Sequence, residues 1–292
     1  MRYQRSREMR ANPPLLQTFY YELRAMNATG DESSSVGVDK PKLCLWYAHP
    51  QELSAQGNFD AWVSLISEEE RQRMERFRFE RHRREFLATR VLLRTALSYG
   101  GTRPPASWRF KHNPQGKPSI DPECSSRFNV SNCPDLVVCL TAEGIEVGID
   151  AEPHERAAII AGLANEVFSA RERSQIETLS AERRQDRALS LWTLKEAWIK
   201  AHGMGMSLPL QNVTFHFGQR NGISLELDSR LVEDSRGPWR FCLLDHAGHR
   251  IAIVAETSAT PLLEVRAMGP QLESVSVVAW EQPVWHPRID QL

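Results

Sequence analysis

The sequence predicts an α+β fold, in which helices and strands are grouped along the chain rather than strictly alternating. Three observations indicate it. Short apolar runs bounded by turn residues recur as far as Asp150, helical patterns dominate the next third, and four more strand-like runs follow. At 292 residues the chain can bury a substantial core as one large domain or two modest ones. We predict two halves of similar size that meet near Asp150.

The first half begins with a strand and alternates afterwards between helix signals and short strands. Ser67 is a helix N-cap because three glutamates follow it in the first turn. From Phe86 to Leu97 apolar residues recur at helical spacing, and the pair Gly100-Gly101 ends that helix. A turn-rich stretch then carries Gly116-Lys117-Pro118. The predicted strands of this half are 43–47, 108–111, 128–131, 136–140 and 145–151.

The second half is predicted to begin with helices and to end with strands. The helices are 157–166, 170–179 and 186–202, and the strands are 213–217, 223–227, 239–244 and 250–255. Gly203 and Gly205 end the last helix. The domain prediction is a disordered N-terminal extension over 1–40, an N-terminal subdomain over 41–150, a C-terminal subdomain over 151–260, and an extension over 261–292. That last extension contains one apolar run, 275–280, to which the pattern assigns no role.

Composition excludes several classes of protein. A formal net charge of −1 argues against bulk binding of nucleic acid, so that any basic site must be local. No apolar run approaches the roughly 20 residues of a membrane helix. The five cysteines form no CxxC pair, and their odd number predicts reduced thiols in a cytoplasmic protein.

Two acids stand at the end of the strand that closes the first half. In the run from Ile145 to Glu152 apolar residues alternate with others, so Asp150 and Glu152 project from the same face of the strand. Two carboxylates so placed repel one another unless a proton or a cation lies between them. Mg²⁺ prefers one or two protein carboxylates completed by water and phosphate oxygens. The alternative is an exposed strand face carrying two solvated acids.

A third acid lies on the strongest predicted helix. Trp192, Glu196 and Lys200 are spaced i, i+4, i+8 and therefore share one face. Glu196 completes the metal site in one interpretation, with Lys200 neutralising a phosphate beside it. In the other, Glu196 and Lys200 form a surface ion pair worth a few tenths of a kcal/mol.

Basic residues gather in two places. Nine arginines and three glutamates lie between Arg71 and Arg94, and the loop around Gly116 carries Lys111, His112 and Lys117. A solvated helix face accounts for such an arginine run. Yet the planar guanidinium suits phosphate, and a basic stripe in a neutral protein also suggests an anionic ligand or an acidic partner.

Taken in order, five segments resemble the 4′-phosphopantetheinyl transferase superfamily, in particular its larger pseudo-dimeric type, which includes the surfactin-synthetase activator. The matching segments are 116–118, 128–131, 148–152, 168–169 with the following helix, and 192–200 with Gly203 and Gly205. Each match alone is weak, and the specificity lies in their order and separation. The resemblance spans Leu43 to Ala255 and leaves both ends of the chain outside it.

This resemblance implies two similar α/β subdomains related by a pseudo-two-fold axis, with coenzyme A bound at their junction. It implies that Asp150, Glu152 and Glu196 bind magnesium. Further roles follow from the matched positions: Lys200 near the pyrophosphate, Lys117 in the coenzyme A loop, Arg73 at the nucleotide phosphate, and Ser131, Asn132 and Asp150 in contact with coenzyme A. The implied reaction transfers phosphopantetheine from coenzyme A to a serine of an acidic acyl- or peptidyl-carrier protein. Glu196 and Lys200 are the predicted catalytic residues, and the type suggests a monomer.

One departure from the family is Asn132, which stands where the family usually has histidine. Asparagine donates a hydrogen bond but carries no charge and does not titrate. Two other functions stay open at this point. One is a non-catalytic module that binds carrier proteins with the same fold, and the other is a different two-carboxylate phosphoryl-transfer enzyme such as a nuclease.

Overall fold

The computed structural model describes residues 40–51, 59–203, 205, 208–218, 222–229, 231 and 237–269, together with the backbone of 274–280. All of them belong to one unit of the chain, 38–292. The predicted extension over 1–40 lies outside the described residues apart from Lys40. Within the described ranges, the helices are all too short or too polar to cross a membrane.

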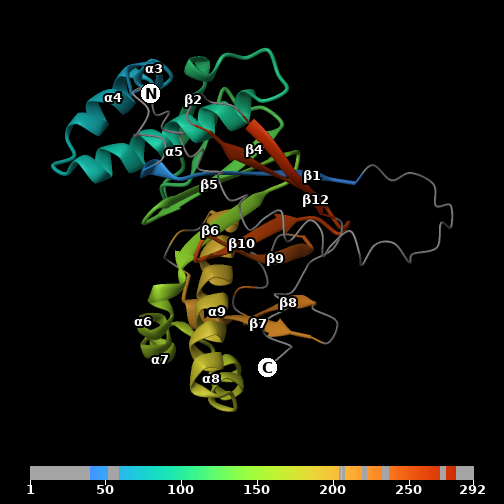
Figure 1. The fold of residues 1–292 in the computed structure, drawn as a ribbon. Helices are drawn as coiled ribbons and strands as arrows, with labels where there is room; N and C mark the ends of the chain where they lie inside the picture. The colour runs from blue at the N-terminus through green and yellow to red at the C-terminus, as the bar shows by residue number, and fades with distance from the viewer. Residues whose placement is uncertain are drawn as a thin grey trace, which may run out of the picture. The chain divides into compact units, whose positions relative to one another are not determined.

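The described chain confirms the α+β prediction and contains the same order of elements twice (Figure 1). The first series is β1 (Lys42–Ala48), α3 (Phe59–Val63), α4 (Glu68–Glu75), α5 (Glu80–Ser98), β2 (Arg109–His112), β3 (Pro118–Asp121), β4 (Ser126–Cys133) and β5 (Leu136–Glu143). The second is β6 (Val147–Pro153), α6 (Ala157–Gly162), α7 (Ala164–Val167), α8 (Ala170–Glu177), α9 (Ala181–His202), β7 (Val213–Phe217), β8 (Ile223–Leu227), β9 (Trp239–His246) and β10 (His249–Glu256). Each series is a strand, a set of helices ending in a long one, a hairpin, and two final strands.

Strand pairing repeats as well. β1 pairs antiparallel with β5 and β5 with β4, while β6 pairs antiparallel with β10 and β10 with β9. Buried side chains of α5 form one core with the first sheet, and those of α9 form another with the second. Two halves built in the same way therefore account for the repeated order, and the strand that begins the second half lies beside β4 of the first.

The end of the described chain returns to the first half. β11 (Leu262–Met268) pairs parallel with β1, and β12 (Ser274–Trp280) pairs antiparallel with β11. The first sheet consequently has five strands in the order β12-β11-β1-β5-β4. Residues 262–268 and 274–280, within the extension predicted from the sequence, are therefore sheet strands. Local pattern does not reveal the role of β11 because its partner β1 lies more than 200 positions earlier, and β12 joins the sheet only through β11.

Several predicted boundaries differ from the structure. α5 begins at Glu80, six residues before its predicted start, because its first turns carry charged side chains rather than an apolar stripe. The helix predicted over 157–166 is two short helices that meet at Leu163. The turn-rich stretch ends in strand β3, which the prediction lacks. By contrast, the Ser67 N-cap is confirmed, with Ser67 and Glu70 forming a capping box.

Candidate active site

The face of α9 predicted to carry Trp192, Glu196 and Lys200 lies against β6. The Trp192 indole Nε1 donates to Glu152 Oε1 at 2.9 Å, and Lys200 Nζ donates to Asp150 Oδ1 at 2.6 Å. The close approach of helix and strand depends on Gly148, because a Cβ atom there would lie 2.0 Å from a backbone carbonyl oxygen of α9. A glycine in β6 thus brings the acids of the strand within reach of the helix.

Both acids of β6 are buried. Asp150 is 5% exposed and Glu152 is 7% exposed, which contradicts the alternative of a solvated strand face. Asp150 Oδ1 accepts from Lys200 and from the Ser131 hydroxyl at 2.9 Å. Asp150 Oδ2 is buried and has no hydrogen-bond partner among the described residues. Burial raises the pKa of Asp150, and the Lys200 ammonium opposes that shift.

Glu196 is held differently from the other two acids. Among the ion pairs of the described residues, Lys200 pairs with Asp150 at 2.6 Å rather than with Glu196, so the surface pair considered from the sequence is not formed. Burial, followed by the negative charge of Asp150, raises the pKa of Glu196. Glu196 therefore faces a site in which a further positive charge would be favourable.

Sequence reasoning missed the partner of Glu152. Arg156 Nη1 lies 2.7 Å from Oε1 and 2.5 Å from Oε2 of Glu152. Arg156 follows Glu152 by four residues, in the turn that leads from β6 into α6. An acid and an arginine four residues apart indicate an ion pair only if the intervening chain is helical. Here the strand β6 ends at Pro153, between the two residues, so the spacing gives no such indication.

Strand β4 supplies the other wall of the site. Ile149 donates its backbone N–H to Asn129 Oδ1 at 3.0 Å, which fixes β4 against β6. Ser131 Oγ accepts from Lys200 Nζ at 3.0 Å while it donates to Asp150. Asn132 is exposed, and strand alternation places it on the opposite face from Ser131. Ser131 therefore connects the acid and the lysine, and Asn132 does not.

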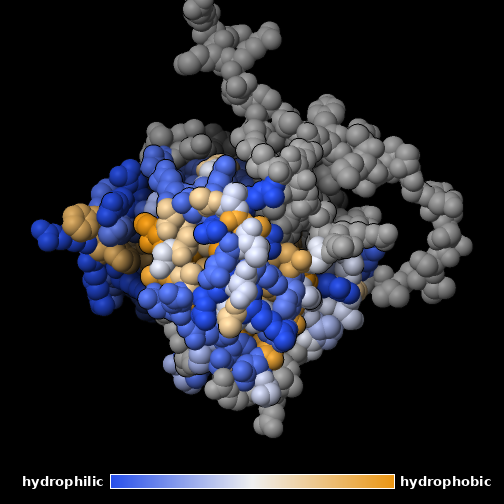
Figure 2. All heavy atoms as spheres, turned by 90° about the horizontal axis from the view of Figure 1, so that it is seen from below, coloured by the Kyte–Doolittle hydropathy of each residue, from blue (hydrophilic) through white to orange (hydrophobic). Residues whose placement is uncertain are grey.

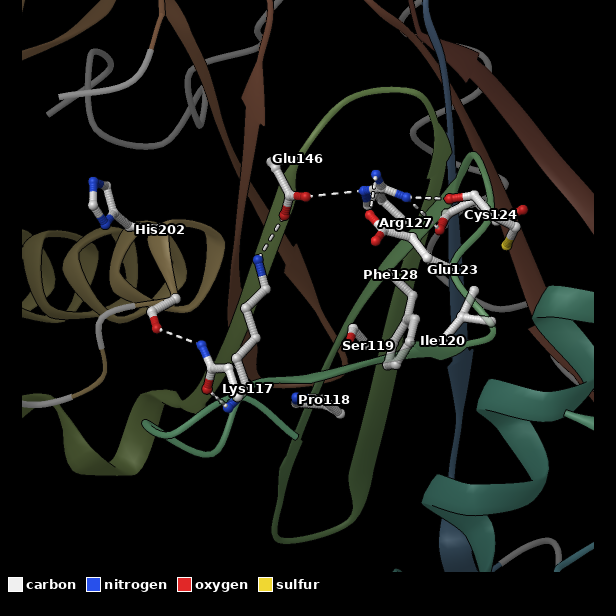
Figure 3. A pocket seen from close by; sticks show the side chains of 13 residues that line it. Lys117, Pro118, Ser119, Ile120, Glu123, Cys124, Arg127, Phe128, Glu146 and His202 are labelled. Carbon is white, nitrogen blue, oxygen red and sulfur yellow. Dashed lines mark hydrogen bonds and ion pairs between the residues drawn. The ribbon is translucent and has the colours of Figure 1, made fainter. Parts of the chain in front are cut away.

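Lys117 crosses from the β2–β3 loop to the end of α9 (Figure 3). Its Nζ donates to Glu146 Oε2 and to the Ala201 carbonyl, both at 2.7 Å. The stem of Lys117 passes so close to Gly203 that a Cβ atom there would lie 2.9 Å from Lys117 Cδ, and Gly203 has φ of +82°. Glu146 also accepts from Arg127, so two ion pairs connect the loop to β4, and the hydrogen bond to Ala201 connects the loop to α9.

The predicted loop and helix residues meet in a cleft of about 290 Å³. Lys117, Glu196 and Lys200 all line it, and their side chains come from the β2–β3 loop and from α9. The complete lining is Gln115, Gly116, Lys117, Pro118, Asn129, Val130, Glu196, Ile199, Lys200, Gly203 and Gly205. A second hollow of about 190 Å³, drawn in Figure 3, shares Lys117, Pro118 and Gly203 with this cleft and is also lined by Arg127. The structure therefore brings together the residues that the sequence placed on separate elements.

The arginines between Arg71 and Arg94 divide into two groups. Arg94 is buried and donates to Glu70 Oε2 at 2.8 Å, and Arg90 lies 3.6 Å from the same carboxylate, so these two hold α5 to the start of α4. The guanidinium of Arg73 lies 5.6 Å from the centre of the Phe86 ring, and Arg73 does not line the cleft.

Two exposed arginines of this run lie beside an exposed aromatic ring. Arg78 and Arg81 lie 5.6 and 5.9 Å from the ring centre of Phe79, which is 54% exposed. On the other half, Ile159 of α6 is also largely exposed. Figure 2, seen from below, shows a mainly hydrophilic surface on which apolar side chains form several small patches.

A buried ion pair beneath the site was also missed. Lys195 and Glu172 are both fully buried, with Nζ 2.7 Å from Oε2, and Glu172 Oε1 accepts from the Phe215 backbone N–H at 2.8 Å. Lys195 precedes Glu196, so this pair anchors the turn of α9 that presents Glu196 to the cleft. The charged Lys195-Glu196 dipeptide, within the mainly apolar stretch 188–199 of this helix, is the local signal of it.

The donor set suits a hard divalent cation. Carboxylate oxygens are the ligands that Mg²⁺ prefers, and Mg²⁺ needs only one or two of them from the protein. Asp150 Oδ2 is such an oxygen, buried and without a partner in the described part of the chain. In that same part, no group of three or more His, Cys, Asp or Glu side chains is arranged closely enough to hold a metal ion. The residues fit a cation that substrate oxygens help to bind, rather than a complete protein cage.

Comparisons with known proteins agree with this arrangement. The model of the 4′-phosphopantetheinyl transferase superfamily matches residues 146–254, and that of the 4′-phosphopantetheinyl transferase N-terminal domain matches residues 53–144. The 4′-phosphopantetheinyl transferase Sfp of Bacillus subtilis (strain 168) is 27% identical over 231 residues, which cover 79% of this chain and 94% of Sfp. The 4′-phosphopantetheinyl transferase psf-1 of Bacillus pumilus is 33% identical over 174 residues, 60% of this chain and 73% of psf-1.

A third relative is similar over a comparable length. The phosphopantetheinyl transferase of Thraustochytrium sp. is 31% identical over 209 residues, 66% of this chain and 71% of the relative. The solved holo-[acyl-carrier-protein] synthase of Neisseria meningitidis matches with a TM-score of 0.35 and 14% identity over 39% of this chain and 98% of its own, too low a score to support an argument. On the strength of the two family models and these sequence relatives, the chain belongs to the 4′-phosphopantetheinyl transferase superfamily.

Proposed function

We propose that this protein transfers 4′-phosphopantetheine from coenzyme A to a serine of a carrier protein and releases adenosine 3′,5′-bisphosphate. The observation that carries the proposal is the cleft, where Lys117, Glu196 and Lys200 meet beside the buried Asp150 in a chain of this superfamily. A cleft lined by two lysines from separate elements suits a polyphosphate ligand.

The chemistry required of the side chains is phosphoryl transfer. The carrier serine oxygen attacks the β-phosphorus, the bond from that phosphorus to the bridging oxygen breaks, and the nucleotide leaves with the electron pair. Lys200, held by Asp150 and Ser131, offsets negative charge that grows on the phosphate oxygens. Lys117 would contact coenzyme A from the loop and Ser131 from β4, and the contact of Asn132, which lies on the opposite face of β4 from Ser131, stays a prediction.

Magnesium is part of the proposal. Asp150, Glu152 and Glu196 would hold it, supported by the unpartnered Asp150 Oδ2. When bound, Mg²⁺ polarises the phosphate oxygens and neutralises charge on the leaving group.

The serine proton needs an acceptor, and Glu196 is our candidate. Its pKa is raised by burial and by the charge of Asp150, which brings a carboxylate nearer to the range in which a general base is effective. Transfer of the serine proton through a water molecule is an equally good route, because it requires only that Glu196 face the cleft.

We infer that the partner is an acidic carrier protein that approaches exposed basic side chains. The support is the group of Arg78 and Arg81 around exposed Phe79, which combines positive charge with an apolar contact. The nucleotide phosphate contact of Arg73 stays a prediction. So do a monomeric state and a cytoplasmic location, the latter supported by five cysteines that are all free thiols.

A mass-spectrometric assay tests the proposal. The protein is incubated with coenzyme A, magnesium and an apo carrier protein, and the carrier is expected to gain one phosphopantetheine. A carrier whose acceptor serine is replaced by alanine serves as the control and is expected to stay unmodified. Carriers that bind the protein but never gain mass would contradict transferase activity and favour a carrier-binding module.

A further inference from the structure

The acids of the site differ in which cation they already hold. Asp150 gives one oxygen to Lys200 and keeps Oδ2 without a partner in the described chain. Glu152 instead has both oxygens engaged by Arg156, and Oε1 also accepts from Trp192. A cation that used Glu152 as a ligand would therefore have to take the place of Arg156.

Exposure differs across this pair. The Glu152 side chain is 10% exposed and the Arg156 side chain is 43% exposed. The partly exposed Arg156 side chain can be solvated when it turns away, whereas Glu152 stays buried wherever Arg156 goes. A buried carboxylate left without its cation is strongly unfavourable, so the departure of Arg156 requires another cation to arrive.

We propose that Arg156 is a built-in counter-cation of Glu152 that competes with the divalent metal for this carboxylate. The inference rests on the proposed function, since it assigns a role toward the metal of that same site. While the metal is absent, Arg156 holds Glu152 in place and compensates its negative charge. It thereby weakens metal uptake and keeps Glu152 from repelling Asp150.

Binding of Mn²⁺ to the full-length protein without coenzyme A tests this competition. Free Mn²⁺ is measured by electron paramagnetic resonance for the wild type, Arg156→Ala and Arg156→Lys. Arg156→Ala is expected to bind Mn²⁺ at least about threefold more tightly, because it removes a partly exposed charge partner of Glu152. Arg156→Lys, which keeps the charge but not the two-oxygen contact, is expected to fall between them.

Two further variants make the result specific. Arg171→Ala removes an exposed arginine of α8 that forms an ion pair with Glu226 of β8. This control variant is expected to leave Mn²⁺ affinity unchanged. In Arg156→Ala combined with Glu152→Gln, the gain in affinity is expected to disappear, because the carboxylate under competition is gone. Thermal unfolding of each variant confirms that it is folded.

Unchanged or weaker Mn²⁺ binding in folded Arg156→Ala would overturn the inference and show that Arg156 only orients Glu152. That failure is separate from failure of the proposed function. The proposed function fails if the wild type modifies no carrier, whereas the competition fails if the wild type is active and Mn²⁺ affinity does not respond to Arg156.

Discussion

Among the three acids of the site, Glu196 is the one that forms no ion pair with another described residue. Asp150 is paired with Lys200 and Glu152 with Arg156, while the pKa of Glu196 is raised by burial and by the neighbouring Asp150. A buried carboxylate in such surroundings accepts a proton more readily than a solvated glutamate does. This environment favours a role of Glu196 in turnover rather than in binding alone.

For Glu196→Gln we expect kcat to fall by about a hundredfold or more, since general bases contribute on that order. The affinity for coenzyme A should change little, because the glutamine keeps the size of the side chain. Steady-state kinetics and calorimetric titration with coenzyme A measure the two quantities. Glu182→Gln, an exposed position on the first turn of α9, is the control, and equal losses of kcat and affinity would indicate a binding role alone.

Asn132 gives a second prediction at the scale of one side chain. Asparagine does not titrate, so we expect KM for coenzyme A to vary little with pH below neutrality. In Asn132→His the KM should fall as the pH drops below about 6.5, where imidazole gains a proton and attracts phosphate. Steady-state kinetics from pH 5 to 8 measure KM for both proteins, with Asn132→Gln as the uncharged control. A KM of the histidine variant that stays constant over this pH range would contradict the prediction.

At the scale of elements, the site depends on the contact between α9 and β6. Gly148→Ala would place a methyl group 2.0 Å from the Ala197 carbonyl oxygen and 2.8 Å from the Ala201 Cβ. We expect a loss of about 2 kcal/mol or more in unfolding free energy, because an overpacked contact forces helix and strand apart. Coenzyme A binding should weaken as well, since Lys200 and Asp150 lie on the two displaced elements.

Urea unfolding and calorimetric titration measure these two effects. Gly162→Ala is the matched control, because no atom lies within 4 Å of a Cβ atom at that position on α6. If Gly148→Ala were as stable and as active as Gly162→Ala, the close contact between α9 and β6 would not be what assembles the site.

The elements also show how far the sequence could lead. β7 and β8 were predicted at their observed limits because turn residues and alternation define them locally. The face of Trp192 and Lys200 was predicted for the same reason, since helical period alone sets it. β11 was missed because its strand character comes from pairing with a distant partner.

The same distinction holds inside the site. Spacing placed Asp150 and Glu152 on one face of a strand, but it could not show that the strand is buried or that Arg156 holds Glu152. Those facts depend on how β4 and α9 cover β6. Residues that meet within one element are predictable from period, and residues that meet across elements require the fold.

At the scale of the described molecule, histidines lie where turns of both halves meet. His49 follows β1, and His246 ends β9, with their Nε2 atoms 3.3 Å apart. His49 Nδ1 lies 2.8 Å from the Asp135 carbonyl oxygen, to which it donates, so the His49 Nε2 accepts from a neutral His246. The Tyr47 ring packs on His246 at 4.4 Å between ring centres, and His249 reaches the Pro134 carbonyl at 2.9 Å.

Burial, with the nearby His49 and His249, lowers the pKa of His246 from 6.5 to about 4. Between these pH values His246 is protonated in the unfolded chain but not in the folded protein. The free energy of unfolding therefore falls as the pH drops from about 6.5 toward 4. The loss reaches up to about 3 kcal/mol. Urea unfolding at several pH values should show a shallower acid loss for His246→Asn, and identical slopes in the two proteins would contradict the assignment.

The parallel pairing of β1 with β11 also bears on how the protein is made. During synthesis β1 leaves the ribosome early, but its outer edge has no partner until residues 262–268 have emerged. Strands β6 to β10 are translated in the meantime. The first half, begun first, is thus completed last, and during that interval the open edge of β1 is a place where another nascent chain can pair.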